Sequence, residues 1–293
     1  VGGSGELGYS WGTYIVSQKN SEGQNASNAP HGYSSGGSKL ALTYMLSFDN
    51  KDLRRDLTCE MFRYENSGMT NIVQKPIAAL TVYCGKWNRL FMATPLGSTS
   101  NKGTGINYTY MRYADVLLMY AEAANENHNG PTPQAKEALK KVRNRAFAAE
   151  DWPEMVDAYV DKLTSKEDFF DAIVKERAWE FGGEKHRRYD LARWNLYGKT
   201  LYNLYFDWIT LGKVARTKQY ENTTTTFEEP TYDERFESYP AVAYYKMVDA
   251  VNPAAVCVSQ TIDWYKEGGK NSYDEAFESY PSKAPTGYTL INM

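Results

Sequence analysis

Ser34 is the first side chain whose surroundings suggest chemistry. It lies in Gly32-Tyr33-Ser34-Ser35-Gly36, which has the Gly-x-Ser-x-Gly form of the nucleophile turn in α/β-hydrolases. That turn needs a buried strand before it, whereas residues 25–31 are polar. Only three histidines could supply the base, and His31 is adjacent to the motif. The pattern therefore favours a loop serine, and a serine esterase that uses Ser34 is the weakest alternative.

The second candidate group consists of Glu176, Glu180 and Glu184, which are four residues apart. A glycosidase needs two carboxylates that face each other across a cleft, one of them with a raised pKa. The neighbouring guanidinium groups would instead lower carboxylate pKa values. We therefore predict a structural ion-pair network between helices, formed by Glu176, Arg177, Glu180, Arg187, Asp190 and Arg193.

No cofactor or metal site is indicated by the motifs. Gly3-Ser4-Gly5-Glu6-Leu7-Gly8 matches the dinucleotide fingerprint, but a strand is predicted after it where a helix is required. The three histidines lack zinc-ligand spacing. We expect no cofactor and no metal, with a structural calcium ion bound by loop Asp and Asn side chains left open.

Composition excludes several classes of function. The net charge is −3, so we expect no nucleic-acid partner. No run of 18 apolar residues could cross a bilayer. The three cysteines have no metal-type spacing, and we expect three buried thiols, although one disulfide is possible. The N-terminus has no signal-peptide pattern, so either the protein is not exported or the chain begins after its targeting segment.

Hydrophobic patterning predicts a minor β component within residues 1–110. Alternation predicts a strand over residues 6–16, and residues 80–84 and 87–92 resemble a strand pair around Gly85. Residues 17–39 and 94–107 are rich in Gly, Ser, Asn or Thr and are predicted to be loops. Residues 40–48 are predicted to be helical.

Residues 111–194 form a helical block. The first helix is predicted to bury Tyr113, Leu117, Tyr120, Ala121 and Ala124. A second helix, capped by Thr132 with Pro133 at its first position, carries the stripe Ala135, Ala138, Leu139, Val142 and Ala146. A third, capped by Ser165, is predicted to bury Phe170, Ile173, Val174, Arg177 and Phe181. A short helix over residues 189–194 follows.

Aromatic and amide side chains gather in the loops before this block. Sugars present apolar faces and polar rims, so their binding proteins place aromatic rings beside hydrogen-bonding groups. The aromatic side chains and their polar neighbours are Trp11, Tyr14, His31, Tyr33, Trp87 and Tyr108 beside Asn25, Asn28, Asn88 and Asn107. Carbohydrate recognition is therefore the chemistry that these residues favour.

The helical block resembles the C-terminal half of the SusD/RagB family of Bacteroidetes surface glycan-binding lipoproteins. The first matching segment is Arg112-Tyr113-Ala114-Asp115-Val116-Leu117-Leu118 with Tyr120-Ala121-Glu122-Ala123. The second is Val142-Arg143-x-Arg145-Ala146, at the end of the next helix. The third is Ile173-x-x-Glu176-Arg177-x-x-Glu180-Phe181, followed by Glu184, Arg187 and Asp190-Leu191-x-Arg193-Trp194.

The resemblance implies a mainly α fold in which tetratricopeptide-type helix pairs support a loop-rich ligand face with minor β-hairpins. The chain would be the C-terminal portion of one SusD-like domain. In that portion, residues 1–110 form the ligand-face region, 111–194 the helical scaffold and 195–293 a Tyr-rich C-terminal region. The N-terminal portion of the family pattern is absent.

The resemblance also implies a non-catalytic role on the outer face of the outer membrane. Family members are tethered there by an N-terminal lipid anchor, which we expect to lie outside this chain, and deliver oligosaccharides to a SusC-like TonB-dependent transporter. They carry ligand aromatics before the Arg-Tyr-Ala-Asp helix. We therefore expect Trp11, Tyr33 and Trp87 to stack on the glycan, with Asn28 and His31 as polar contacts. A relative that binds peptides is the alternative within the same fold.

Overall fold

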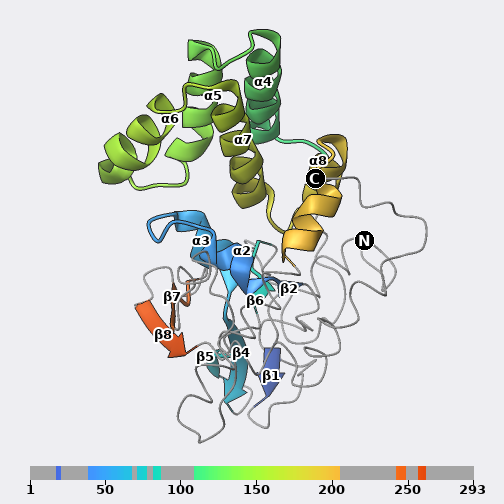
Figure 1. The fold of residues 1–293 in the computed structure, drawn as a ribbon. Helices are drawn as coiled ribbons and strands as arrows, with labels where there is room; N and C mark the ends of the chain where they lie inside the picture. Colours follow the sequence, from blue (N-terminus) through green and yellow to red (C-terminus); the bar gives the residue numbers. More distant parts are fainter. Residues whose placement is uncertain are drawn as a thin grey trace, which may run out of the picture. The chain divides into compact units, whose positions relative to one another are not determined.

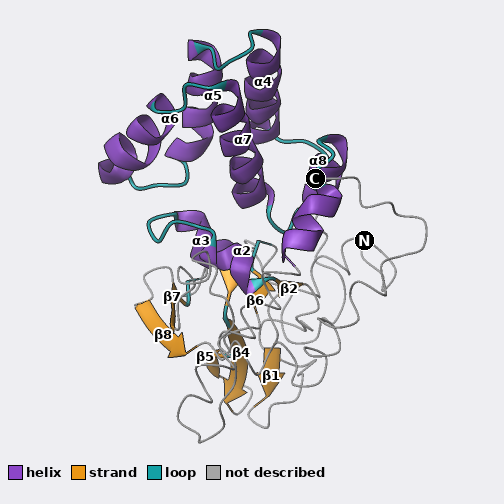
Figure 2. Ribbon diagram, viewed as in Figure 1, coloured by secondary structure: helices purple, strands orange, loops and turns teal. Residues whose placement is uncertain are grey.

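The described part of the chain is mainly helical, which confirms the predicted fold class (Figures 1 and 2). The computed structural model describes residues 18–20, 39–67, 71–77, 82–86, 109–204, 242–248 and 257–261. Within these ranges the chain separates into two compact units. The first contains the described residues up to Asp190 together with Tyr244–Ser259, and the second contains the remainder. Apart from α8, β7 and β8, which have residues in both units, the features analysed below lie in the first unit unless stated otherwise.

The central element of the first unit is a helix hairpin formed by α4 (Tyr113–Asn127) and α5 (Pro133–Asn144). Between the two helices, Asn129 has a φ of 52°, a left-handed conformation that asparagine tolerates better than most residues. Thr132 then caps α5, because its Oγ1 accepts a 3.1 Å hydrogen bond from the Ala135 amide. Pro133 occupies the first position of the helix, as predicted.

Helix α7 (Lys166–Phe181) packs against this hairpin. Its cap also follows the prediction, since Ser165 accepts a 3.0 Å hydrogen bond from the Asp168 amide. The core between the three helices is built from small and branched side chains of α4 and α5 and from larger ones of α7. All of the stripe predicted for the second helix is buried, namely Ala135, Ala138, Leu139, Val142 and Ala146.

The predicted inner face of α4 is confirmed in part, since Ala121 is buried and Leu117 and Ala124 pack against the core, and it is wrong at the two tyrosines. Ala114, Leu118, Ala121 and Asn125 are buried, whereas Tyr113 and Tyr120 are exposed. Both sets have helical spacing, so α4 has apolar side chains on two faces. The small residues face the core, because they let α5 and α7 approach closely, and the tyrosines face outward.

A smaller correction applies to α7. Ile173, Arg177 and Phe181 are buried as predicted. Phe169 takes the buried position expected for Phe170, and both Phe170 and Val174 are only partly buried. Because Phe169 and Phe170 are adjacent, helical spacing alone does not indicate which of the two is buried.

Between α5 and α7 the chain forms three short elements that the sequence pattern did not predict. They are a 3-10 turn at Ala149–Asp151, a π-helix at Pro153–Ala158 and helix α6 at Tyr159–Asp161. Val156 and Val160 anchor them in the interior. Helix α8 (Arg187–Arg193) matches the predicted short helix closely.

Two short helices precede the hairpin in sequence, α2 (Leu42–Leu46) and α3 (Leu53–Thr58). The first confirms the helix predicted within residues 40–48, and the second was not predicted. Tyr44 of α2 donates a 2.9 Å hydrogen bond to the Ala178 carbonyl of α7. A side chain at Gly182 would collide with the same tyrosine hydroxyl, so this close approach requires glycine.

The strands form three small sheets in the described residues. One has the order β1-β4-β5, formed by Gln18–Asn20, Phe62–Ser67 and Asn71–Pro76. Another has the order β2-β6-β3, formed by Lys39–Leu40, Val82–Cys84 and Cys59–Glu60. The third pairs β7 (Val242–Lys246) with β8 (Cys257–Thr261).

Strand β6 confirms part of the predicted strand pair, but its described partners are β2 and β3. The other predicted partner, residues 87–92, lies outside the described residues, as does the predicted strand at 6–16. Strand β1 falls in a segment predicted to be a loop. Of the three cysteines, Cys59 and Cys84 are buried as expected and Cys257 is exposed, which corrects the expectation for Cys257.

Leu139 tests the packing of the hairpin, since its side chain is fully enclosed by α4, α5 and α7. We expect Leu139→Ala to lower the free energy of unfolding by about 2–5 kcal/mol, because it removes buried methyl groups and leaves a cavity. Leu53→Ala is the matched control, since Leu53 is 54% exposed, and it should change stability by less than about 1 kcal/mol. Urea unfolding followed by circular dichroism measures both, and equal losses would contradict this packing.

Candidate functional site

Three carboxylates on one side of α7 and its C-terminal extension organise the first unit. We call Glu176, Glu180 and Glu184 the carboxylate row. All three are buried. A buried carboxylate is stable only if cations and hydrogen-bond donors replace the water that it has lost. In this structure the cations come from four other segments of the chain.

The first half of the row binds α3 and α5. Arg54 of α3 donates to Glu176 at 2.7 Å and to Glu180 at 2.8 Å. Arg143 of α5 donates to the second oxygen of Glu176, also at 2.7 Å. Glu176 therefore has one guanidinium on each carboxylate oxygen, and it fixes α3 and α5 to α7.

The second half of the row binds the start of α4 and the segment after β6. Arg112, the residue before α4, donates to Glu184 through Nε at 2.9 Å and through Nη2 at 2.8 Å, and it also pairs with Glu180. Lys86, two residues after β6, donates to Glu184 and to the backbone carbonyl of Glu180.

A second buried cluster joins α4, α7 and α8. Arg177 donates to Asp115 of α4 at 2.6 Å and to Asp190 of α8 at 2.8 Å. Its guanidinium also lies over the Phe181 ring, at 4.9 Å from the ring centroid. The single arginine thus links three helices.

Of the six residues predicted to form ion pairs, the structure brings Glu176, Arg177, Glu180 and Asp190 into these two clusters. Arg187 instead donates to the Val174 backbone carbonyl at 2.8 Å. Arg193, in the second unit, lies over the Trp194 ring at 4.3 Å.

The cations of the row were not predicted as partners of these glutamates. Arg54, Lys86, Arg112 and Arg143 are far from α7 in sequence, and helical spacing relates only residues of one helix. One sequence feature that could have indicated buried ion pairs was a charged residue among the apolar residues of a helix. Asp115 lies beside the buried Ala114 and Leu118, and Arg143 follows the buried Val142.

The charges around the row determine its protonation. Burial on its own raises the pKa of Glu180, but the guanidinium groups of Arg112 and Arg54 lower it by more. Burial likewise raises the pKa of Glu184. The hydrogen bonds and charge interactions of Glu184 with Arg112 and Lys86 outweigh this effect, so the pKa of Glu184 lies below its ordinary value. Both carboxylates are therefore anions at neutral pH, a state suited to ion pairing and unsuited to general acid catalysis.

The side chains expected to contact the ligand, Trp11, Asn28, His31, Tyr33 and Trp87, lie outside the described residues, as does Ser34. The structure does describe the residue before Trp87. Lys86 is held at the C-terminal end of α7 by Glu184 and by the Glu180 carbonyl. The backbone that enters residue 87 is therefore fixed to the helical scaffold.

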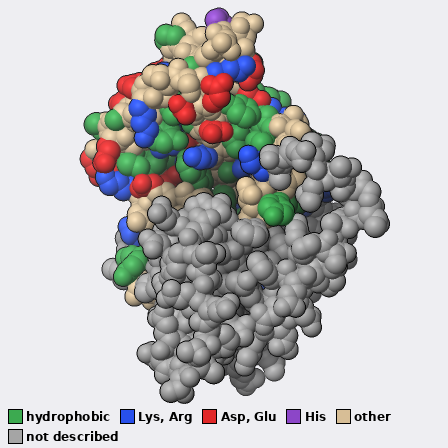
Figure 3. All heavy atoms as spheres, viewed as in Figure 1, with side chains coloured by type: hydrophobic (Ala, Val, Ile, Leu, Met, Phe, Trp, Pro, Cys, Tyr) green, Lys and Arg blue, Asp and Glu red, His purple; other side chains and the backbone are tan. Residues whose placement is uncertain are grey.

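The outward side of α4 carries a row of exposed apolar side chains. We call Tyr113, Val116 and Tyr120 the α4 outer face, and Tyr110 and Met111 extend it in front of the helix. Tyr113 is 69% exposed and Tyr120 is 49% exposed. Over the described helices in Figure 3, hydrophobic side chains reach the surface among charged ones. Exposed apolar groups in a row are typical of a surface that contacts another molecule.

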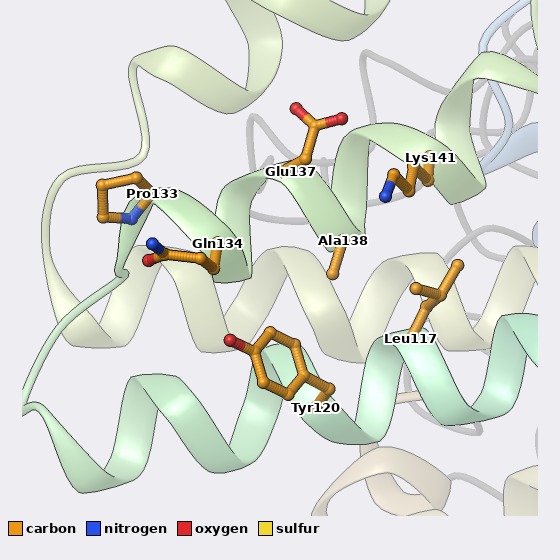
Figure 4. Close-up of a pocket in the computed structure, with 7 residues that line it drawn as sticks. All are labelled: Leu117, Tyr120, Pro133, Gln134, Glu137, Ala138 and Lys141. Atoms are coloured by element: carbon orange, nitrogen blue, oxygen red, sulfur yellow. The ribbon is translucent and has the colours of Figure 1, made fainter.

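A groove between α4 and α5 borders this face (Figure 4). Its volume is about 390 Å³, and Tyr120 and Leu117 line it from α4. Helix α5 contributes the remaining lining residues, which are Pro133, Gln134, Glu137, Ala138 and Lys141. The groove combines an aromatic ring with amide, carboxylate and ammonium groups, so it can accept an amphipathic side chain or a polar ring.

Neither a metal cluster nor a membrane span is found within the described ranges. No three His, Cys, Asp or Glu side chains there are arranged to hold a metal ion. No helix in the same ranges is both long enough and apolar enough to cross a membrane.

The model of the SusD family matches residues 11–255. The chain belongs to the SusD family. Two relatives agree with this assignment. A SusD-like protein of Formosa agariphila is 46% identical over 90 residues, which are 31% of this chain and 16% of that protein. A solved SusD homolog from Bacteroides thetaiotaomicron is 27% identical, with a TM-score of 0.54 over 68% of this chain and 40% of that one.

The match with the family confirms the resemblance drawn from the helical block and the SusD-like fold. The chain spans well under half of each of these two relatives, 16% of one and 40% of the other. The 11–255 match also extends upstream of the helical block, so that it includes Trp11, Asn28, His31, Tyr33 and Trp87.

Glu180→Gln tests the carboxylate row. The pKa of Glu180 is lowered in the folded state, so its ion pairs stabilise the fold fully at pH values above the ordinary carboxylate pKa. This stabilisation is lost as the pH falls through the lowered pKa of the folded protein. We expect the variant to lose about 3 kcal/mol at pH 7 and to show a weaker further loss between about pH 5 and pH 2 than the parent.

Asp171→Asn is the matched control, because Asp171 lies on the same helix and is exposed. It should leave both the stability at pH 7 and its pH dependence close to those of the parent. Chemical denaturation at a series of pH values provides the measurement. An unchanged pH dependence in Glu180→Gln would mean that the row does not stabilise the fold.

Proposed function

We propose that this chain is the glycan-binding part of a surface protein that captures oligosaccharides and delivers them to a SusC-like TonB-dependent transporter. Membership of the SusD family, with the match over residues 11–255, is the observation that carries the proposal. Family membership supports a glycan-binding role in nutrient uptake in general. The delivery step, the ligand and the lipid-anchored position on the outer face of the outer membrane belong to the proposal.

The described structure supports a binding role over a catalytic one. The carboxylates that most resemble a catalytic group are those of the carboxylate row, and each is paired with arginine or lysine. The neighbouring cations lower the pKa values of Glu180 and Glu184, so these two carboxylates stay ionised near neutral pH and hold segments together. The proposed protein therefore binds its glycan without cleaving it.

In this proposal Trp11, Tyr33 and Trp87 stack on the apolar faces of the sugar rings, and Asn28 and His31 bind hydroxyl groups. The anchoring of Lys86 supports the choice of Trp87, since a ring on a fixed backbone loses less entropy on binding. In this proposal the helical scaffold supports the segments that carry these rings.

The transporter is proposed to contact the α4 outer face and the adjoining groove. These side chains are exposed in the first unit, and their apolar area would be covered by a partner. Tyrosines suit such a surface, because the hydroxyl stays hydrated before contact and the ring is buried after it. Glycan and transporter would then bind to different parts of the protein.

Substitution of the proposed stacking rings tests the glycan site. We expect Trp87→Ala and Tyr33→Ala to weaken retardation of the full-length protein in polysaccharide-containing native gels by at least tenfold in apparent affinity, because each ring contributes a stacking contact. Tyr113→Ala is the matched control, since it removes an exposed aromatic ring from the helical scaffold.

The glycan panel should contain plant, host and microbial polysaccharides. We expect one class of polysaccharide to retard the parent protein. This retardation should be lost in the two site variants and kept in the control. Unchanged retardation in both site variants would show that the site residues are wrong. If no polysaccharide retards the parent, the glycan proposal fails, and a peptide ligand becomes the better explanation.

A separate measurement tests the proposed transporter contact. We expect the double variant Val116→Glu/Tyr120→Glu to reduce binding to the purified transporter at least tenfold, because it places two charges in an apolar contact. Lys175→Glu, at an exposed position of α7, is the matched control. Retardation by glycan should stay unchanged in both proteins. Normal transporter binding by the double variant would exclude this face.

A further inference from the structure

Two buried cysteines lie opposite each other in the β2-β6-β3 sheet. Cys59 of β3 and Cys84 of β6 are paired in antiparallel register. Their exposed fractions are 1% and 2%. Directly opposed residues of an antiparallel pair have their side chains on the same face of the sheet, so the two thiols share one side. The structure describes both as free thiols.

The hydrogen bonding next to this pair indicates its spacing. The Gly85 amide donates to the Thr58 carbonyl at 2.9 Å, and Thr58 and Gly85 are the next opposed residues along the two segments. Opposed residues alternate between hydrogen-bonded and non-hydrogen-bonded pairs, which makes Cys59 and Cys84 a non-hydrogen-bonded pair. Cα atoms in such pairs are about 4.5 Å apart, and disulfides span about 4.4–6.8 Å. The backbone therefore already lies within reach of a disulfide.

We propose that Cys59 and Cys84 form a disulfide in the exported protein. The proposal rests on the cell-surface location in the proposed function, because disulfides persist outside the reducing cytoplasm. Cys257 is exposed and has no such opposed partner in the described residues, so it remains a free thiol.

The oxidant would be the disulfide of an envelope thiol–disulfide oxidoreductase. One cysteine thiolate attacks that disulfide, forms a mixed disulfide and releases the first thiolate of the oxidant. The second cysteine thiolate then attacks the sulfur of the first cysteine and releases the second thiolate of the oxidant. Two thiols of this protein lose their hydrogens, and the oxidant leaves as a dithiol.

Burial determines when this exchange takes place. In the folded protein burial raises the pKa of the Cys59 thiol well above its ordinary value and the pKa of the Cys84 thiol to about 11. Little thiolate is present at neutral pH, and no oxidant can reach the pair. The exchange therefore belongs to the folding stage, before β3 and β6 are covered.

The bond would join two segments that the carboxylate row also holds. Cys59 follows α3, which carries Arg54, and Cys84 precedes Lys86. A side chain at Gly183 would collide with the Cys84 sulfur, so the glycine leaves room for the sulfur beside the end of α7. The disulfide would thus brace the backbone that leads into Trp87.

Peptide mapping of the parent protein tests the proposal without any variant. The full-length protein is recovered from the cell surface, quenched in acid, alkylated under denaturing conditions and digested with trypsin. Cleavage after Arg63 places Cys59 and Cys84 on different peptides, residues 56–63 and 64–86. We expect a linked species whose mass is the sum of the two peptides less two hydrogens. Alkylated Cys59 and Cys84 in the exported protein, or a bond from either to another cysteine, would overturn the proposal.

The same protein made in a reducing cytoplasm is the comparison, and it should show both cysteines alkylated. The exported parent should melt about 5 °C or more above its reduced form, and Cys59→Ala/Cys84→Ala should show no effect of reductant. Equal melting temperatures of the oxidised and reduced parent would show that the bond does not brace the fold. Glycan retardation is measured separately, so loss of the disulfide proposal leaves the glycan proposal intact.

Discussion

The first unit depends on the neutralisation of three buried carboxylates by cations from four distant segments. Glu176, Glu180 and Glu184 cannot be enclosed as anions unless Arg54, Lys86, Arg112 and Arg143 are all in place. Each cation in turn loses water and needs the carboxylates or an aromatic face. The Arg143 guanidinium, for example, lies 3.8 Å from the Tyr159 ring centroid. This mutual requirement makes the assembly of α3, the β6 extension, α4 and α5 on α7 a single cooperative event. Hydrophobic burial alone would tolerate several arrangements of these helices, whereas paired charges tolerate far fewer.

The row also links the scaffold to the region proposed to bind the glycan. Lys86 is the only cation of the row that comes from the strand-rich part of the first unit as described here, and it directly precedes Trp87. Its position is set by the same carboxylate that binds Arg112 at the start of α4. Binding side chains on connecting segments are positioned by the rigid elements at which those segments begin and end. The buried ion pair of Lys86 fixes the described end of the segment that leads to Trp87.

The sequence predicted local features well and long-range partners poorly. The caps at Thr132 and Ser165 and the stripe from Ala135 to Ala146 depend on neighbours within a few residues, and the structure confirms them. Tyr113 and Tyr120 were wrongly assigned to the inner face of α4, because that helix carries two apolar faces and periodicity cannot choose between them. The ion-pair partners of the glutamates could not be predicted for a different reason. Arg54 and Glu176, for example, are 122 residues apart, and local sequence patterns do not relate such distant residues. The proposed ligand contacts lie outside the described residues, so only a binding measurement can test them.

The two faces of α4 would let one helix serve both the core and the proposed transporter contact. Its inner face has Ala114 and Ala121, small residues that permit close helix packing, and its outer face has Tyr113 and Tyr120. A leucine-rich outer face would bury more area but would favour aggregation of the free protein. Tyrosine reduces this risk, because its hydroxyl remains hydrated while the ring is still available for contact. An outer face built in this way suits the contact with a transporter that we propose for it.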